Sequence, residues 1–196
     1  MTPSGVECPA AHPSGGPGAK LLGTKSPDSV HMRSMKTLTH AERDAFLTRY
    51  EAGPALLRAA WNSVPRETRQ WRPASGKWSA HEVVVHCADS DAYGHTRIRM
   101  MLAEAKPLIV AYDENVWARV FDYHAHDPEL ALRTIDAVRT NTIACLRRLP
   151  DSAFGKLGTH TASGIYTDAD WFRIYAEHLE VHARQIERNL ATWRAR

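Results

Sequence analysis

Apolar residues recur along most of this 196-residue chain at intervals of three and four positions, the spacing that places them on one face of an α-helix. Helix-capping residues mark the starts: Thr39 and Ser79 each precede a glutamate by three positions, and Asp127 precedes a proline. The helices predicted from these signals span residues 39–64, 79–105, 127–149 and 167–196. Because no strand pattern of comparable strength competes with them, we predict an all-α protein with a four-helix bundle.

Long connections join the predicted helices, at residues 65–78, 106–126 and 150–166. They exceed the length usual in a simple up-and-down bundle. The middle one is rich in aromatic residues, so we expect it to pack over the bundle and to form a lid or the wall of a pocket. Gly53-Pro54 in the first helix predicts a bend or an interruption there.

Residues 1–34 are rich in Pro, Gly, Ser and Ala, a composition that buries too little apolar surface to offset the entropy of ordering. We therefore expect a flexible N-terminal tail ahead of one domain at residues 35–196. The alternative is an overcalled start codon, because Met32 and Met35 directly precede the first helix.

Composition narrows the class of protein further. Hydrophobic residues make up 43% and charged residues 24%, and the net charge is only +3, so disorder and an electrostatic surface for nucleic acid are not indicated. The three cysteines form no C-x-x-C pair, and no apolar run of about 18 residues appears. We expect a cytoplasmic protein with a small-molecule substrate and with neither a nucleic acid nor a membrane as partner.

The fourth predicted helix carries two histidines on its apolar stripe. His178 and His182 are spaced i and i+4, which puts their Cβ atoms about 6 Å apart and lets both rings bind one ion through bonds of about 2.1 Å. Such a pair also arises in ordinary helix packing, so both interpretations stay open. The residues that share this predicted inward face are Trp171, Ile174, Tyr175, His178, Val181, His182, Gln185 and Ile186.

A third histidine, His86, lies in the apolar sequence VVVHCAD of the second predicted helix. Burial penalises a charged imidazole and leaves even a neutral one in need of a partner, which a metal ion would supply. Glu82 and Asp89 share its face and could accept a hydrogen bond from its free N–H or act as ligands, although Glu82 is equally explained as a capping residue. A core histidine bonded to an ordinary acceptor is the alternative.

Other residues are weaker candidates. His160, Tyr112 and Glu114 lie in the connections and could act as proton donor, substrate contact or catalytic group, and Tyr93 and Trp117 could line a pocket. Each also fits plain packing or a surface position. His81 and His95 do not share the helix face of His86. His124 and His126 form an H-x-H pair that could chelate a surface ion or lie in a solvated loop.

Taken together, the order and spacing of these motifs resemble the DinB/YfiT-like superfamily of four-helix bundles. The resemblance covers about residues 39–190. The matching residues are Trp78-Ser79, Glu82, His86, Asp89-Ser90, Gly164, Thr167, His178, His182 and Gln185-Ile186.

The resemblance implies a divalent ion held by His86, His178 and His182, with zinc or nickel favoured over manganese or iron, and a homodimer. Three neutral imidazoles would leave the charge of the ion uncompensated, so a bound water or thiol should lose its proton near neutral pH. We therefore expect a metal-dependent hydrolase, or an S-transferase with a low-molecular-weight thiol as cosubstrate. The alternative is a stress-response bundle that binds a metal or ligand without turnover.

Overall fold

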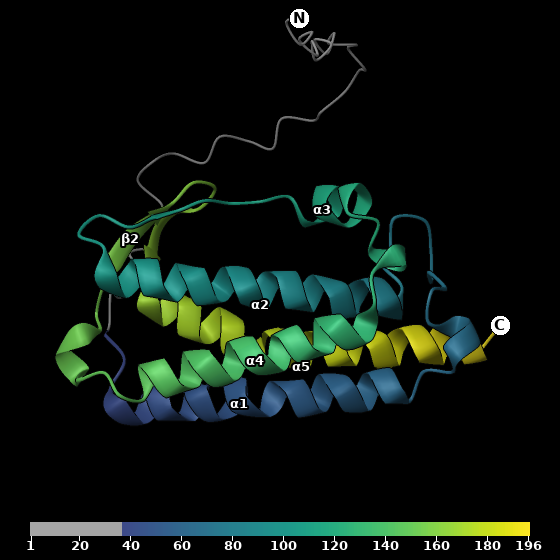
Figure 1. Ribbon diagram of the computed structural model, residues 1–196, viewed down its shortest axis with the longest axis horizontal. Helices are drawn as coiled ribbons and strands as arrows, with labels where there is room; N and C mark the ends of the chain where they lie inside the picture. The colour runs from purple at the N-terminus through teal and green to yellow at the C-terminus, as the bar shows by residue number, and fades with distance from the viewer. Residues whose placement is uncertain (1–36) are drawn as a thin grey trace, which may run out of the picture. The chain divides into compact units, whose positions relative to one another are not determined.

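The computed structural model describes residues 37–196, so the predicted tail lies outside the described part of the chain. Four long helices dominate this part and confirm the all-α four-helix bundle (Figure 1): α1 His40–Asn62, α2 Ala80–Ala103, α4 Pro128–Leu146 and α5 Asp168–Arg194. The shorter elements are α3 Glu114–Val120, η2 Arg66–Thr68, η3 Tyr123–Ala125, η4 Asp151–Ala153, β1 Leu108–Ile109, β2 Leu157–His160 and β3 Gly164–Thr167. Over residues 37–196, no helix has both the length and the apolar character that crossing a membrane requires.

Side-chain caps fix where the long helices begin. The side chains of Thr39, Ser79 and Thr167 each accept a hydrogen bond from the backbone three residues on, and the acidic residue at that position bonds back to the cap. Asp127 caps α4 ahead of Pro128. These reciprocal bonds satisfy backbone N–H groups that have no partner within the helix.

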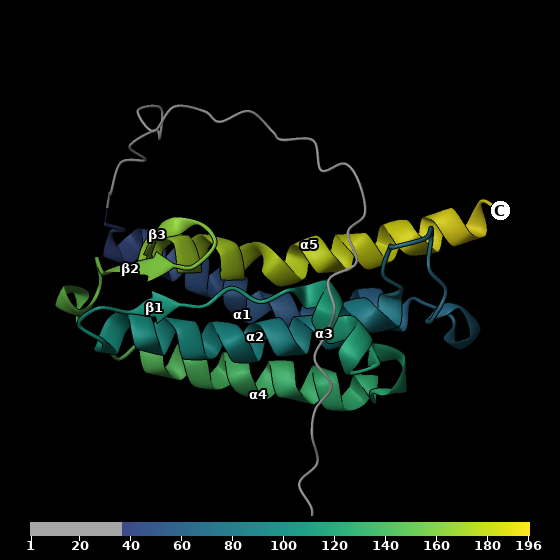
Figure 2. The ribbon, with the colours of Figure 1, turned by 90° about the horizontal axis from the view of Figure 1, so that it is seen from above.

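The direction of the helices explains the length of the middle connection. In Figure 1, α1 and α5 run in one direction and α2 and α4 in the opposite one. Because α2 and α4 are parallel, the chain must return along the whole of α2 before α4 can begin. Figures 1 and 2 show this return segment, with α3 within it, lying along α2.

A small three-stranded sheet, which the sequence pattern did not predict, joins two of the connections. β1 pairs in parallel with β2, with Ile109 opposite His160, and β2 pairs antiparallel with β3, with Gly158 opposite Tyr166. Strands of two to four residues are too short to show the alternation by which a strand is recognised. The sheet brings residues 108–111 beside the turn that follows His160.

Of the two outcomes predicted for Gly53-Pro54, an interruption of the first helix is wrong, because α1 runs unbroken from His40 to Asn62. Proline has no N–H for the carbonyl of Tyr50, four residues earlier. The buried guanidinium of Arg139 donates to that carbonyl instead, at 2.5 Å. A Cβ on Gly53 would lie 2.6 Å from Nη1 of Arg139, so the glycine makes room for the replacement donor.

The buried face of α5 differs in part from the predicted stripe. Ile174 and Val181 were expected to face inward, but they are 49% and 44% exposed. The core-facing side lies further round the helix, where Phe172, Leu179 and Ala183 are buried. His178 and His182 are consequently half-buried, at the edge of the core rather than at its centre.

Candidate metal centre

Three histidine side chains converge between α2 and α5. His86 comes from α2, and His178 and His182 stand one turn apart on α5. The ring centroids are 5.4 Å apart for His86 and His178, 4.9 Å for His86 and His182, and 4.5 Å for His178 and His182. One nitrogen from each ring lies within 4.8 Å of the other two, and no other group of three such side chains comes this close within residues 37–196.

Burial keeps all three imidazoles neutral. It lowers the pKa of His86 to about 3, with a further contribution from His182, and it lowers the pKa values of His178 and His182 as well. A neutral imidazole has a free lone pair on one nitrogen, which is the form that binds a metal. The histidines therefore present lone pairs rather than positive charges near neutral pH.

Two ring nitrogens in this group lack a partner. Nδ1 of His86 and Nδ1 of His178 are buried and accept or donate no hydrogen bond within the described residues. Nδ1 of His182 lies 2.9 Å from Oε1 of Gln185, which orients that ring with Nε2 free. Because buried polar atoms are normally partnered, the two orphaned nitrogens indicate a missing ligand.

The spacing of the rings fits a metal ion. Two nitrogens bound to a tetrahedral ion at about 2.1 Å lie about 3.4 Å apart. The observed upper limit of 4.8 Å exceeds this by about 1.4 Å, which small rotations of the side chains can close. Three nitrogen donors would leave a coordination position open, as in catalytic rather than structural zinc sites.

The immediate surroundings of the three histidines combine aromatic and polar groups. The ring of Trp78 lies 4.6 Å from that of His86, and Oγ of Ser90 lies 3.4 Å from Nε2 of His178. Oε2 of Glu114 is 3.8 Å from Nε2 of His86, and burial raises the pKa of this half-exposed carboxyl. Glu114, one of the sequence-based catalytic candidates, is therefore beside the histidines.

Glu82 and Asp89 bind groups other than His86. Glu82 closes the capping box of α2 and pairs with Arg72. Asp89 accepts a hydrogen bond from the hydroxyl of Tyr123 at 2.5 Å. The prediction that they support His86 is not borne out by these contacts, and the capping interpretation of Glu82 is the one the structure shows.

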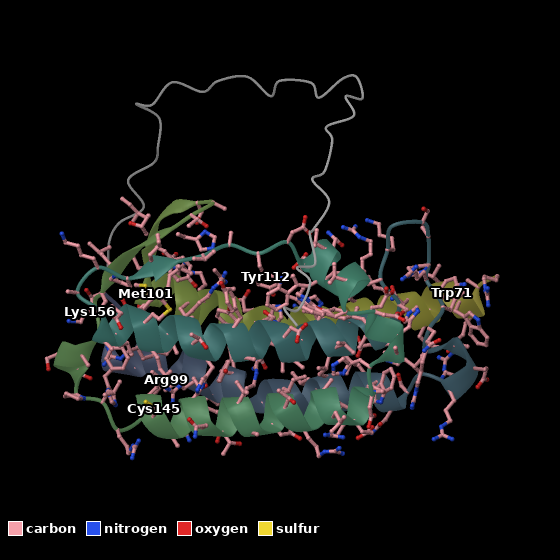
Figure 3. All side chains as sticks on the ribbon, turned by 45° about the horizontal axis from the view of Figure 1, so that its top comes forward. Trp71, Arg99, Met101, Tyr112, Cys145 and Lys156 are labelled. Carbon is pink, nitrogen blue, oxygen red and sulfur yellow. The ribbon has the colours of Figure 1, made fainter. Side chains whose placement is uncertain are left out.

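Tyr112 belongs to an aromatic cluster beside the histidines. Its ring lies 5.1 Å from that of Tyr93 and 4.4 Å from that of Trp117, and Phe121 packs on Trp117. Figure 3 places Tyr112 on the return segment over the middle of α2. The expectation that this connection packs over the bundle is met.

The remaining histidines have partners of their own. His160 accepts hydrogen bonds at Nδ1 from the backbone N–H groups of Ala162 and Ser163. The bonds made by the others join His81 to the carbonyl of His126 at 2.8 Å, His95 to Thr142 at 2.7 Å and His124 to Ser79 at 2.8 Å. Nε2 of His124 is therefore engaged by the cap of α2.

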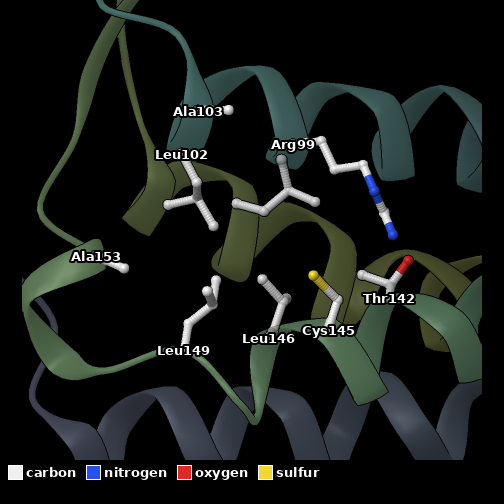
Figure 4. A pocket seen from close by; sticks show the side chains of 9 residues that line it. Arg99, Leu102, Ala103, Thr142, Cys145, Leu146, Leu149 and Ala153 are labelled. Atoms are coloured by element: carbon white, nitrogen blue, oxygen red, sulfur yellow. The ribbon is translucent and has the colours of Figure 1, made fainter.

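An apolar pocket of about 350 Å³ lies elsewhere, between α2 and α4 (Figure 4). Leucines, an isoleucine and alanines form most of its wall, with Arg99, Thr142 and Cys145 at one side. It holds no cluster of metal ligands among the described residues. We therefore place the candidate functional site at the histidines between α2 and α5 and not at this pocket.

The fold and the convergent histidines together define a four-helix bundle with a candidate metal centre. The family model described as the DinB superfamily matches residues 49–186. This match covers well over half of the sequence, so the chain belongs to the DinB superfamily.

Its relatives carry names that agree with the site. A protein of Oceanobacillus iheyensis, named as a candidate metal-dependent hydrolase, is 28% identical over 149 residues, covering 76% of this chain and 86% of the relative. YfiT of Bacillus subtilis, which bears the same kind of name, is 26% identical over 152 residues, covering 77% and 85%.

Two solved structures share the fold. YfiT, described as a probable metal-dependent hydrolase with an unusual four-helix bundle topology, superposes with a TM-score of 0.73 at 26% identity, covering 79% of this chain and 89% of YfiT. The mycothiol-dependent maleylpyruvate isomerase gives a TM-score of 0.52 at 10% identity, covering 74% of this chain and 57% of that one. The second likeness shows the fold alone.

Proposed function

We propose that this protein is a metal-dependent hydrolase of a small molecule, with a divalent ion held by His86, His178 and His182. The observation that carries the proposal is the pair of buried, unpartnered nitrogens within a group of three neutral imidazoles. The names of the relatives support hydrolysis as the reaction.

A divalent ion bound there would act as a Lewis acid and make water a nucleophile near neutral pH. The protein would hold the ion through three neutral rings, with Gln185 fixing the orientation of His182. Trp78 covers one side of His86 and limits the access of bulk water. Among the described residues, Glu114 places a carboxylate closest to His86, and we assign Oε2 of Glu114 as the acceptor of the proton lost by the attacking water.

Zinc is the metal we propose first, because it accepts three nitrogen ligands and an open position in a tetrahedral arrangement. Nickel is the second choice, since imidazole also suits it. A low-molecular-weight thiol could take the place of water as the nucleophile, which would make the protein an S-transferase.

Metal binding is tested first, by calorimetry with zinc and nickel on the purified protein and on variants. We expect one ion per chain. Removing a residue that only hydrogen-bonds to a metal ligand typically weakens metal binding about 10–100-fold, so His178→Ala, which removes a ligand itself, should weaken it by more than this. His126→Ala, which removes a histidine outside the group, is the matched control and should bind normally. Equal binding by all three proteins would refute the assignment.

Turnover is tested on the metal-loaded protein with carboxylic esters, amides and phosphoesters, each with and without added thiols. Hydrolysis that Glu114→Gln slows at least tenfold, with metal affinity unchanged, is the expected result. Product formation only with a thiol would replace hydrolase by S-transferase. Metal binding without turnover of any substrate would favour the non-catalytic alternative.

A further inference from the structure

Arg97 lies on the same face of α2 as His86, eleven residues or about three helical turns further on. Its Nη2 donates to the carbonyl of Val110 at 2.9 Å and its Nη1 donates to the hydroxyl of Tyr175 at 3.2 Å. Its guanidinium also stacks on the ring of Tyr93, 4.5 Å from the centroid. These contacts hold the side chain in one orientation.

The charge of Arg97 is not balanced by a nearby acid. Within residues 37–196, no carboxylate lies within ion-pair distance of its guanidinium, whereas most other half-buried or buried arginines of the helices are paired, such as Arg139 with Asp91 and Arg49 with Glu180. Its Nε is buried and has no hydrogen-bond partner among these residues. A fixed guanidinium with one unused, buried donor is suited to an anionic ligand.

Two more donors lie on the strands next to Val110, since Ile109 pairs with His160 and β2 pairs with β3, and the charge of Arg97 acts to lower the pKa of both. The hydroxyl of Tyr166 is buried and also unpartnered within the described residues, and its ring lies 5.7 Å from that of His160. Since two backbone N–H groups donate to Nδ1 of His160, the proton of the neutral ring is on Nε2, which can donate. Burial and the charge of Arg97 both lower the pKa of His160, which keeps this ring neutral.

We propose that Arg97, Tyr166 and His160 form a subsite for a carboxylate group of the substrate. The three side chains offer one positive charge and several N–H and O–H donors, which match a monovalent, planar carboxylate better than a divalent phosphate. Tyr175 connects this donor cluster to the candidate metal centre, since its hydroxyl accepts from Arg97 and its ring lies 6.1 Å from that of His178.

This inference rests on the proposed function and narrows it to one class of substrate. The substrate would carry a free carboxylate at one end and a hydrolysable ester or amide several bonds away. The carboxylate would be held by the donor cluster while the reacting carbonyl lies at the three histidines. Because the guanidinium is fixed relative to the three histidines, the site would select substrates by the charge of this end group and by the length of the chain between it and the reacting carbonyl.

The test uses the protein loaded with cobalt(II) and a pair of probes, 6-mercaptohexanoate and 6-mercaptohexan-1-ol. Both thiols can bind the metal, which gives a charge-transfer absorption in the near ultraviolet, but only the first has a carboxylate. We expect the acid to bind at least about tenfold more tightly than the alcohol, the difference that one charge-assisted hydrogen bond provides.

Arg97→Met should reduce this preference to about threefold or less while leaving cobalt binding unchanged. Arg99→Met is the matched control, because it removes the same charge two residues away on α2, from a side chain that faces the apolar pocket (Figure 4). Tyr166→Phe removes a single oxygen and should lower the preference in part, which keeps the test valid if Arg97→Met fails to fold.

The outcomes separate this inference from the proposed function. Failure to bind cobalt would remove the metal centre and the subsite with it. Normal cobalt binding with equal affinities for the acid and the alcohol would overturn the carboxylate subsite alone. A preference that Arg99→Met abolishes as fully as Arg97→Met would also overturn it, because the effect would then be one of overall charge.

Discussion

Arg139 offers the sharpest test of how this fold is held together. Its side chain is fully buried and donates to both carboxylate oxygens of Asp91, at 2.6 and 3.0 Å, to the carbonyl of Tyr50 at 2.5 Å and to that of Tyr175 at 3.3 Å. The carbonyl of Tyr50 is the one left without a helical donor by Pro54. Arg139→Met removes all of these donors while keeping most of the volume.

The expected loss is large. Removing one partner of a buried ion pair costs about 3–5 kcal/mol, because it leaves the other charge uncompensated. The carbonyl of Tyr50, left without a donor, adds about 1–3 kcal/mol, whereas that of Tyr175 keeps its helical donor within α5. The sum is comparable to the 5–15 kcal/mol that stabilise a typical domain, so we expect Arg139→Met to lower the free energy of unfolding by about 5 kcal/mol or to prevent folding.

A double-mutant cycle isolates the contribution of the Tyr50 carbonyl. Pro54→Ala restores an N–H that can donate to this carbonyl, so the cost of Arg139→Met should be about 1 kcal/mol smaller in the Pro54→Ala background. General effects of removing a proline cancel, since both sides of the cycle contain them. Urea denaturation followed by circular dichroism measures each free energy of unfolding.

If Arg139→Met alone does not fold, the cycle is run with Asp91→Asn present in every protein, because the uncompensated charge is then absent. A cost of Arg139→Met below about 1 kcal/mol in the otherwise native chain would refute the structural role of the ion pair. An identical cost with and without the Pro54→Ala substitution would refute the idea that Arg139 replaces the missing helical donor.

Three further predictions concern the helix faces around the site. In the metal-free protein, the free energy of unfolding should fall by about 1.4 kcal/mol per pH unit below about pH 6.5 for each such histidine, because the unfolded chain gains a proton that His86 in the fold refuses down to about pH 3. Thermal melts between pH 4 and 8 test this slope; saturating zinc should raise the stability without removing the slope, because His86 is neutral in the fold with or without the ion. Gly94→Ala should destabilise by about 1–3 kcal/mol in urea titrations, although alanine is the better helix former, because its Cβ would lie 2.3 Å from the ring of Tyr175; a stabilised variant would contradict this contact. Replacing Ile174 or Val181 by lysine should change the unfolding free energy by less than about 0.5 kcal/mol, and a loss above about 2 kcal/mol would mean that these residues are buried after all.

The sequence was sufficient for the helices and for the three histidines that converge, because both depend on local spacing. Capping boxes marked the starts of α1 and α2, and Asp127 with Pro128 marked the start of α4. The i, i+4 pair of histidines lies on one face of α5, so a single histidine from one neighbouring helix completes the group. The exposed Ile174 and Val181 show the limit of this reasoning, since a helical stripe gives a face but not the exact angle at which it meets the core.

What the sequence could not show depends on contacts between distant segments. Arg139, which donates to the carbonyl that Pro54 leaves without a helical donor, is 85 positions later in the chain, and no local pattern links the two. The pairing of β1 with β2 joins residues 51 positions apart. Arg97 is a different case. It lies eleven residues after His86, which places both on one face of α2, so the sequence alone could have indicated Arg97 as a candidate site residue.

The parallel arrangement of α2 and α4 accounts for the composition of the whole site. It forces the chain to return along α2, and this return segment supplies Glu114 beside His86 and Tyr112 beside Tyr93. The same segment contains β1, which pairs with β2 and so brings the loop of His160 to the end of the segment where the carbonyl of Val110 fixes Arg97. An up-and-down bundle could carry the three histidines on its helices, but it would have no segment at this position to carry the carboxylate or the carbonyl. The parallel arrangement of α2 and α4 is therefore what adds a candidate proton acceptor and a fixed guanidinium to a candidate metal centre that two helices could form by themselves.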